Sequence, residues 1–218
     1  MKIFKDRQAA GKLLAQRLGE FRNVGDAIVL GIPRGGVAVA KEVASQLRLP
    51  LDIVVTRKIG APNQPELALG AVGPDGEVFW EEGLLSELGI GPEQLKLGVL
   101  RELEEIKRRE KEYRHARPGL VKLVRGKTVI LVDDGIATGA TMLSAIRYLK
   151  RHMAKKIILA VPVASKEAVD RVVRELGSAS RRIGEVVVLE TPEYFQAVGQ
   201  FYNEFNPVLD EEVVKLLT

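Results

Sequence analysis

Short runs of Val, Ile and Leu alternate with stretches of helical periodicity along most of this chain, and no other feature constrains the fold as strongly. The runs predict strands at residues 27–31, 51–58, 66–72, 127–134, 156–164 and 185–190. Helical patterns lie at 6–18, 36–47 and 166–176, and another follows residue 139. Strands that are apolar at nearly every position are buried on both faces. The sequence therefore predicts an α/β fold, with a mostly parallel central sheet flanked by helices.

The composition suits one globular domain spanning residues 1–218. Hydrophobic residues make up 46% of the chain and charged residues 28%, a balance typical of folded proteins. There is no cysteine, which excludes a disulfide framework, thiolate catalysis and a cysteine-ligated metal. His115 and His152 are the two histidines, too few for a His-rich metal site. Scarce Asn and abundant Glu, Arg and Lys favour a thermophilic source.

Charge and hydropathy limit where the protein can be located and which partners it can bind. The N-terminal segment carries charges throughout, unlike a signal peptide, and no run approaches the roughly 20 apolar residues of a membrane helix. We expect a cytoplasmic protein without membrane contact. The net charge of +4 suits an anionic ligand such as a phosphate ester. It is too small to indicate nucleic-acid binding, which we do not expect.

Residues 83–119 interrupt the alternation and are predicted to form a helical insertion. Its long helix opens near Pro92 and has an apolar stripe of Leu95, Val99, Leu103, Ile106 and Tyr113. The remaining positions are densely charged. We interpret the insertion as a surface helix with one packed face, and a dimer contact or a lid beside a site are the alternatives. Interleaved Glu disfavours nucleic-acid binding.

The stretch VILVDDGIATGATM, residues 129–142, holds the strongest chemical signal. Asp133 and Asp134 follow a predicted central strand, at the carboxyl end where open α/β sheets bind ligands. Two adjacent ionised carboxylates are destabilising unless a partner matches them. Ribose hydroxyl groups and Mg²⁺ would both do so.

The residues after the two aspartates are almost bare backbone. Small side chains let N–H groups approach an anion closely, and a helix starting near Gly139 points its positive end at that anion. Thr138 and Thr141 add hydroxyl donors. No lysine follows the glycines, so this is not a nucleoside-triphosphate loop of the Walker A type. The two aspartates and the segment 135–141, which we call the cradle, together predict a site for a ribose 5-phosphate unit.

This motif resembles the signature of the type I phosphoribosyltransferases, which bind phosphoribosyl pyrophosphate (PRPP). The resemblance implies a type I phosphoribosyltransferase-like fold with a hood, and often a homodimer. It implies that a ring nitrogen displaces pyrophosphate from C1 of PRPP with Mg²⁺ present. The two acids would hold the ribose hydroxyls as catalytic residues, Asp133 also touching the metal. The 5′-phosphate would be bound by Gly135, Ile136, Ala137, Thr138, Gly139, Ala140 and Thr141. Gly135 departs from the family, most of whose members carry an aliphatic residue there.

Two further segments resemble the family's pyrophosphate-binding elements. GIPRGG, residues 31–36, would bind pyrophosphate through Arg34, Gly35 and Gly36, with a cis peptide expected at Arg34–Gly35. TRKIGAPNQPELALG, residues 56–70, has the composition of a loop that can open and close, and resembles the flexible loop that covers the substrates. Arg57 and Lys58 would meet the pyrophosphate, the alternative being two solvated surface cations. Glu66 is interpreted as a local structural partner.

The acceptor base is the least constrained part of the prediction. Ala137 stands where enzymes for 6-oxopurines usually carry an aspartate, which disfavours hypoxanthine and guanine. The family builds its base pocket from the loop after the fifth strand and from a hood. Here these would be Pro162 and Val163, together with Tyr194 and Phe195 in the aromatic C-terminal segment 190–218, which we call the hood. Phe201, Tyr202 and Phe205 of the same segment could also stack on a base, and core packing of a C-terminal cap is the alternative for these aromatic residues.

Two classes of function remain open from the sequence. One is an enzyme that transfers the phosphoribosyl group of PRPP to a nitrogenous base. The other is a regulatory protein that binds PRPP without turnover. A third possibility, again an enzyme, is a ribose-phosphate enzyme that runs the reaction in the other direction or uses an unusual acceptor.

Overall fold

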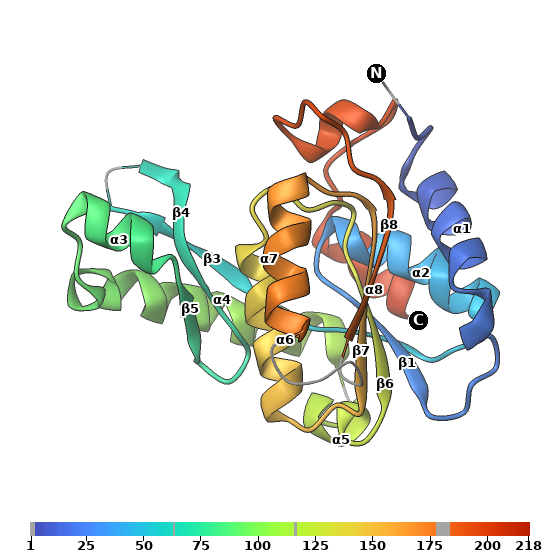
Figure 1. The fold of residues 1–218 in the computed structure, drawn as a ribbon. Helices are drawn as coiled ribbons and strands as arrows, with labels where there is room; N and C mark the ends of the chain where they lie inside the picture. Colours follow the sequence, from blue (N-terminus) through green and yellow to red (C-terminus); the bar gives the residue numbers. More distant parts are fainter. Residues whose placement is uncertain (1–2, 63, 116, 178–183) are drawn as a thin grey trace.

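A five-stranded parallel sheet forms the centre of the protein, in a computed structural model that describes residues 3–62, 64–115, 117–177 and 184–218 (Figure 1). The strand order is β2-β1-β6-β7-β8. The strands are β1 (Ala27–Gly31), β2 (Leu51–Ile53), β6 (Thr128–Val132), β7 (Lys156–Val163) and β8 (Gly184–Glu190). All four neighbouring pairs are parallel. The predicted α/β fold class is confirmed.

Helices cover both faces of this sheet, because alternate strand residues point to opposite sides. On one face, Val29, Ile130 and Ile158 pack against α1 (Arg7–Arg17) and α2 (Gly35–Leu47). On the other face, strand residues such as Ile28, Leu131 and Leu159 pack against α6 (Ala140–Arg151) and α7 (Lys166–Gly177). The short α5 (Leu120–Val124) closes that second layer.

A smaller antiparallel sheet projects from one side of the body as an arm (Figure 1). It contains β3 (Arg57–Ala61), β4 (Gln64–Val72) and β5 (Val78–Trp80). The predicted single strand 51–58 is wrong, because β2 ends at Ile53 and β3 begins at Arg57. Val54 and Val55 between them are buried in different core clusters, so the apolar run continues while the chain changes sheet. Residues 56–70, predicted as a loop, are largely the antiparallel strands β3 and β4, and Asn63 lies outside the described residues.

The insertion packs on this arm through the predicted apolar stripe. It contains most of α3 (Glu82–Leu88), a 3₁₀ turn at Pro92–Leu95 and α4 (Lys96–Arg114). Ile106 and Tyr113 of α4 are buried with Ile59 of β3 and Val213 of α8 (Asp210–Leu217). The C-terminal helix therefore ties the insertion to the body.

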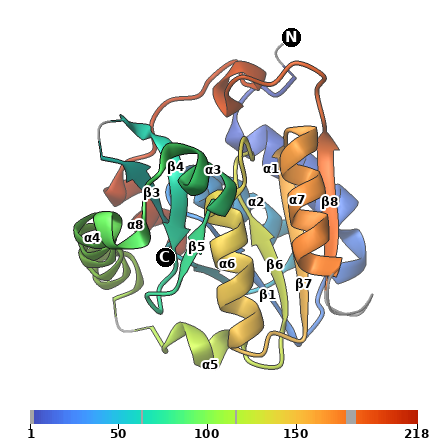
Figure 2. The same cartoon turned by 60° about the vertical axis from the view of Figure 1, so that its left-hand side comes forward.

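The N-terminal segment meets the hood around residues 198–205 near the carboxyl ends of the central strands (Figures 1 and 2). Phe4 and Tyr202 form a β-bridge, and both are buried with Phe201, which ends the 3₁₀ turn Val198–Phe201. The core-packing alternative therefore holds for Phe201 and Tyr202. No helix in the described part of the chain has the length and apolar character needed to cross a membrane.

Candidate active site

Asp134 is held by one hydrogen bond from each of the two terminal segments. Its Oδ2 accepts a hydrogen bond from Arg7 Nε at 2.8 Å, and its backbone carbonyl accepts one from the Tyr202 hydroxyl at 2.6 Å. The Arg7 guanidinium lies 3.8 Å above the ring of Phe205 and also donates to the Asn206 carbonyl. Sequence patterns did not point to Arg7, because it lies 127 positions from the acid that it pairs with.

Burial and mutual repulsion raise the pKa of Asp133 well above its usual value. Burial also raises the pKa of Asp134, and the positive charge of Arg7 opposes that rise. The backbone N–H of Asp134 donates to Asp133 Oδ1 at 2.8 Å, which holds the first carboxylate beside the neighbouring residue. The pair therefore favours a ligand that brings hydrogen-bond donors or positive charge.

Two glycines of the 31–36 loop lie directly against these carboxylates. A Cβ on Gly35 would lie 1.9 Å from Asp134 Oδ2, and one on Gly36 would lie 2.7 Å from Asp133 Oδ1. Neither distance leaves room for a side chain, so the loop and the acids approach closely only because both positions are glycine. The predicted cis peptide at Arg34–Gly35 is wrong, because the cis bond joins Pro33 to Arg34.

The cradle after the acids is held by α7 and by Ser165, the residue that precedes this helix. Ser165 Oγ donates to the Ala137 carbonyl at 2.7 Å, and Arg171 Nη1 donates to the Thr138 carbonyl at 2.9 Å. Gly139 adopts φ +88°, and α6 begins at the next residue. The cradle lines a cavity of about 290 Å³, the smaller cavity, together with both aspartates, Thr141, Lys58, Val198 and Phe205.

Packing against the hood explains why position 135 is a glycine and not an aliphatic residue. A Cβ there would lie 2.6 Å from Val198 Cγ1 and 3.0 Å from Val163 Cγ1. The hood side chain thus fills the space that an aliphatic residue would need, and only glycine fits beneath it.

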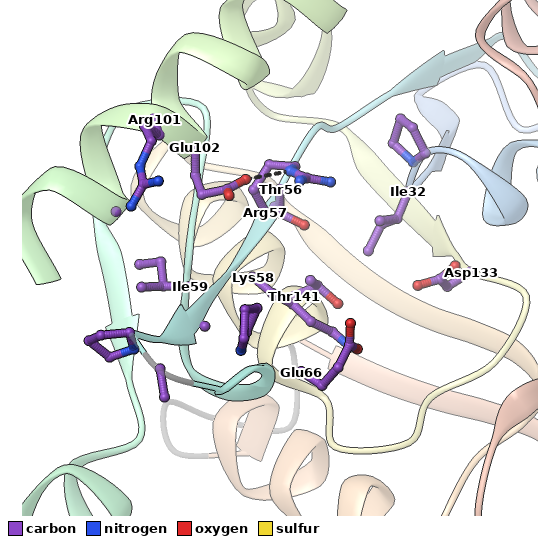
Figure 3. A pocket seen from close by; sticks show the side chains of 16 residues that line it. Ile32, Thr56, Arg57, Lys58, Ile59, Glu66, Arg101, Glu102, Asp133 and Thr141 are labelled. Atoms are coloured by element: carbon purple, nitrogen blue, oxygen red, sulfur yellow. Dashed lines mark hydrogen bonds and ion pairs between the residues drawn. The ribbon is translucent and has the colours of Figure 1, made fainter.

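A larger cavity of about 620 Å³ adjoins the smaller one, and Asp133 lies at its edge (Figure 3). Its charged lining consists of Arg57 and Lys58 from β3, Glu66 from β4, Asp133, and Arg101 and Glu102 from α4. Lys58, Asp133 and Thr141 border both cavities. Thr56 is 4% exposed and lines the larger cavity, and its Oγ1 has no hydrogen-bond partner among the described residues. Sequence reasoning missed Thr56, Arg101 and Glu102.

Some predicted site residues lie elsewhere. The Arg34 side chain donates to Asp210 Oδ1 at 3.3 Å, and within the described ranges Arg34 lines neither cavity. Pro162 and Val163 are buried in β7, and Tyr194 is 81% exposed. Phe195 lines a separate cavity beside Ser165. These four predicted base-binding residues do not assemble into one pocket, because strand packing buries two of them and the hood turns Tyr194 toward solvent.

The fold and this site define a class of protein. The model of the phosphoribosyl transferase domain family matches residues 3–175, so the chain belongs to that family, and the resemblance inferred from the motif is confirmed.

Individual relatives and solved structures are similar to this chain over its full length. A provisionally named phosphoribosyl transferase of Mycobacterium tuberculosis is 42% identical over 217 residues, which is 100% of this chain and 47% of the relative. This chain thus spans about half the length of the curated relatives it matches. The crystal structure of a Thermus thermophilus protein is similar with a TM-score of 0.77 and 41% identity, over 100% of this chain and 98% of that one. A Neisseria gonorrhoeae hypothetical protein, solved with bound ppGpp, shares the fold at 17% identity and a TM-score of 0.50, over 100% and 96%.

Proposed function

We propose that the protein is a Mg²⁺-dependent phosphoribosyltransferase, which transfers the 5-phosphoribosyl group of PRPP to a nitrogenous base and releases pyrophosphate. One observation carries the proposal. Asp133 of the acid pair borders two cavities, one formed with the glycine-rich cradle and one whose lining includes the cations Arg57, Lys58 and Arg101. PRPP has the same order of groups, with a phosphate and a pyrophosphate on either side of a ribose that bears hydroxyls.

The acids have two tasks in this proposal. Asp133 and Asp134 accept hydrogen bonds from the ribose hydroxyls, and their negative charge stabilises the positive charge that develops on the sugar as the bond to pyrophosphate breaks. Arg7 keeps Asp134 oriented toward the ribose by holding one of its oxygens.

The remaining residues bind the two ends of PRPP. The 5′-phosphate occupies the smaller cavity, where the backbone of residues 135–141 and the start of α6 receive it. The pyrophosphate occupies the larger cavity, where Arg57 and Lys58 neutralise the leaving group.

The donor set fits a magnesium ion that binds mainly through the substrate. Mg²⁺ commonly takes one or two protein carboxylates plus substrate phosphates, and Asp133 offers such a carboxylate at the border of both cavities. Within the described ranges, no cluster of three or more His, Cys, Asp or Glu side chains could hold a metal ion by itself. Bound Mg²⁺ would supply positive charge to the leaving pyrophosphate.

The acceptor class is a nitrogen-containing ring other than a 6-oxopurine. Ala137 is exposed on the cradle and offers no carboxylate to such a ring.

An assay of pyrophosphate release tests the function. The protein is incubated with PRPP and Mg²⁺ across a panel of purines, pyrimidines and other nitrogen acceptors, and turnover with one acceptor identifies the substrate. PRPP binding without turnover on any acceptor would favour the regulatory alternative. An Asp134→Asn variant that folds is expected to lose PRPP binding or turnover. Normal binding and turnover by that variant would refute the assignment of the acid pair.

A further inference from the structure

The insertion helix α4 forms one wall of the larger cavity (Figure 3). Gly98, Arg101 and Glu102 from its first two turns line the cavity opposite Ile32 and Asp133. Gly98 has nothing within 4 Å of an added Cβ, so the helix backbone borders open space there. A helix that the sequence marks as a charged surface element is therefore part of the site's lining.

Glu102 contacts the Arg57 guanidinium at its Nε atom. Arg57 Nε donates to Glu102 Oε2 at 2.7 Å, and the two side chains are 33% and 27% exposed. In Figure 3 the guanidinium extends from this contact toward the side of the cavity where Ile32 and Asp133 lie. Because Nε is occupied, the two Nη groups are the ends presented to an anion, and a guanidinium offers them as a fork that matches phosphate oxygens.

Arg101 brings a third cation to the same space. Its side chain extends from α4 toward β3 and Ile59 (Figure 3). Among the described residues, its Nε has one long hydrogen bond of 3.4 Å, to the Leu97 carbonyl of its own helix. Arg57, Lys58 and Arg101 together balance the charges of Glu66, Glu102 and Asp133. The larger cavity has about twice the volume of the smaller one, which leaves room for a pyrophosphate and a bound cation.

The far end of α4 is anchored to the pyrophosphate loop through Asp210. Tyr113 donates its hydroxyl proton to Asp210 Oδ1 at 2.5 Å, and Arg108 donates to Oδ2 at 2.9 Å. Arg34 of the 31–36 loop shares Oδ1. One carboxylate thus fixes the helix and the loop relative to each other, so that Arg101 is presented from a supported element.

We propose that α4 completes the pyrophosphate subsite. Arg101 binds the outer phosphoryl oxygens of the leaving group, and Glu102 is a positioning residue that aims Arg57. This inference rests on the proposed phosphoribosyltransferase function, and it assigns to the insertion a part of the site that lies outside the cradle and the acid pair.

Calorimetric titration of the full chain with magnesium pyrophosphate, and separately with ribose 5-phosphate, tests the proposal. Arg101→Gln is expected to weaken magnesium pyrophosphate binding about tenfold or more, the usual cost of a charge-assisted contact to phosphate, and to leave ribose 5-phosphate binding within about twofold. Lys107→Gln is the matched control, because it removes the same charge from an exposed position of α4 that does not line the cavity. Thermal unfolding of each variant checks that it folds.

The two variants at residue 102 separate positioning from packing. Glu102→Ala is expected to weaken magnesium pyrophosphate binding several-fold, and Glu102→Gln to restore it, because the amide oxygen can still accept the Arg57 Nε proton. Equal weakening by both variants would overturn the positioning role.

The failures of the two proposals are distinguishable. If the unmodified chain binds PRPP and Arg101→Gln binds magnesium pyrophosphate with the same affinity as the Lys107→Gln control, the role proposed for α4 is refuted and the proposed function stands. If the unmodified chain binds neither PRPP nor ribose 5-phosphate, the proposed function fails and the role of α4 fails with it.

Discussion

Replacing Arg7 by Met tests how the acid pair is held. Methionine keeps an apolar stem near the Phe205 ring but removes the cation and its hydrogen bonds to Asp134 and Asn206. The Arg7 and Asp134 side chains are 12% and 15% exposed, so the pair is largely shielded from solvent. Removing one partner of a buried ion pair costs about 3–5 kcal/mol. Because both side chains keep some exposure, we expect about 3 kcal/mol at neutral pH. In a domain of this size that corresponds to a fall in Tm of roughly 6–12 °C.

A double-mutant cycle isolates the contact. Unfolding by urea is measured for the unmodified protein, Arg7→Met, Asp134→Asn and the double variant. Because the asparagine carries no charge to leave unpaired, the double variant should lose less than the sum of the two single losses. We expect a coupling free energy of about 2 kcal/mol, within the range for residues in one hydrogen-bonded ion pair.

The loss in Arg7→Met should also depend on pH. Without the cation, the pKa of each carboxyl group rises further above its usual value in the folded state, so the folded state binds more protons than the unfolded state. Stability then falls as pH rises through the raised pKa values, and the deficit of the variant should shrink when pH is lowered from about 8 toward 5. A coupling below about 0.5 kcal/mol together with a pH-independent deficit would refute this account.

Three more predictions concern glycine positions and the Asp210 contacts. Gly35→Ala should weaken PRPP binding at least about tenfold in calorimetry, since its Cβ would overlap Asp134 Oδ2, and unchanged affinity would contradict the close approach. Gly135→Val should lower Tm by several degrees through a clash with Val198, and adding Val198→Ala should recover most of that loss, a rescue whose absence would place the clash elsewhere. Hydrogen bonds from Tyr113, Arg108 and Arg34 lower the pKa of Asp210 to about 2, so it stabilises the fold above pH 4 and loses that effect as pH falls from about 4 to 2. Asp210→Asn should therefore be less stable at pH 7 and match the unmodified protein near pH 2 in urea unfolding, whereas an equal deficit at both values would exclude the charge as the cause.

Local sequence patterns predict the central sheet because burial acts on each strand separately. Val129–Val132 is apolar at every position, and the structure buries all four residues between two helical layers. The alternation of strands and helices then leaves few topologies open, since parallel strands need covered crossovers. The boundary between β2 and β3 escaped prediction, because Val54 and Val55 remain buried while the chain passes from one sheet to the other.

Part of the site can likewise be predicted from the local sequence. The acid pair and the cradle lie within one short segment, so their juxtaposition follows from a strand, a loop and a helix in succession. The assignment of individual residues within the site to ligands has not been tested and stays a prediction. The same holds for the single domain, the homodimer, the cytoplasmic location and the thermophilic source.

The amino-acid sequence by itself therefore determined the family, the fold class and the place of Asp133 and Asp134 at the end of a central strand. Only the tertiary structure decided which charges meet. Arg34 pairs with Asp210 and Arg57 with Glu102, and Arg7 rather than either of them reaches Asp134. The physical reason is the separation along the sequence over which each effect acts. Burial and helix or strand formation depend on neighbouring residues, whereas an ion pair requires two side chains a few ångströms apart, and for residues 127 positions apart only the packing of whole elements sets that distance.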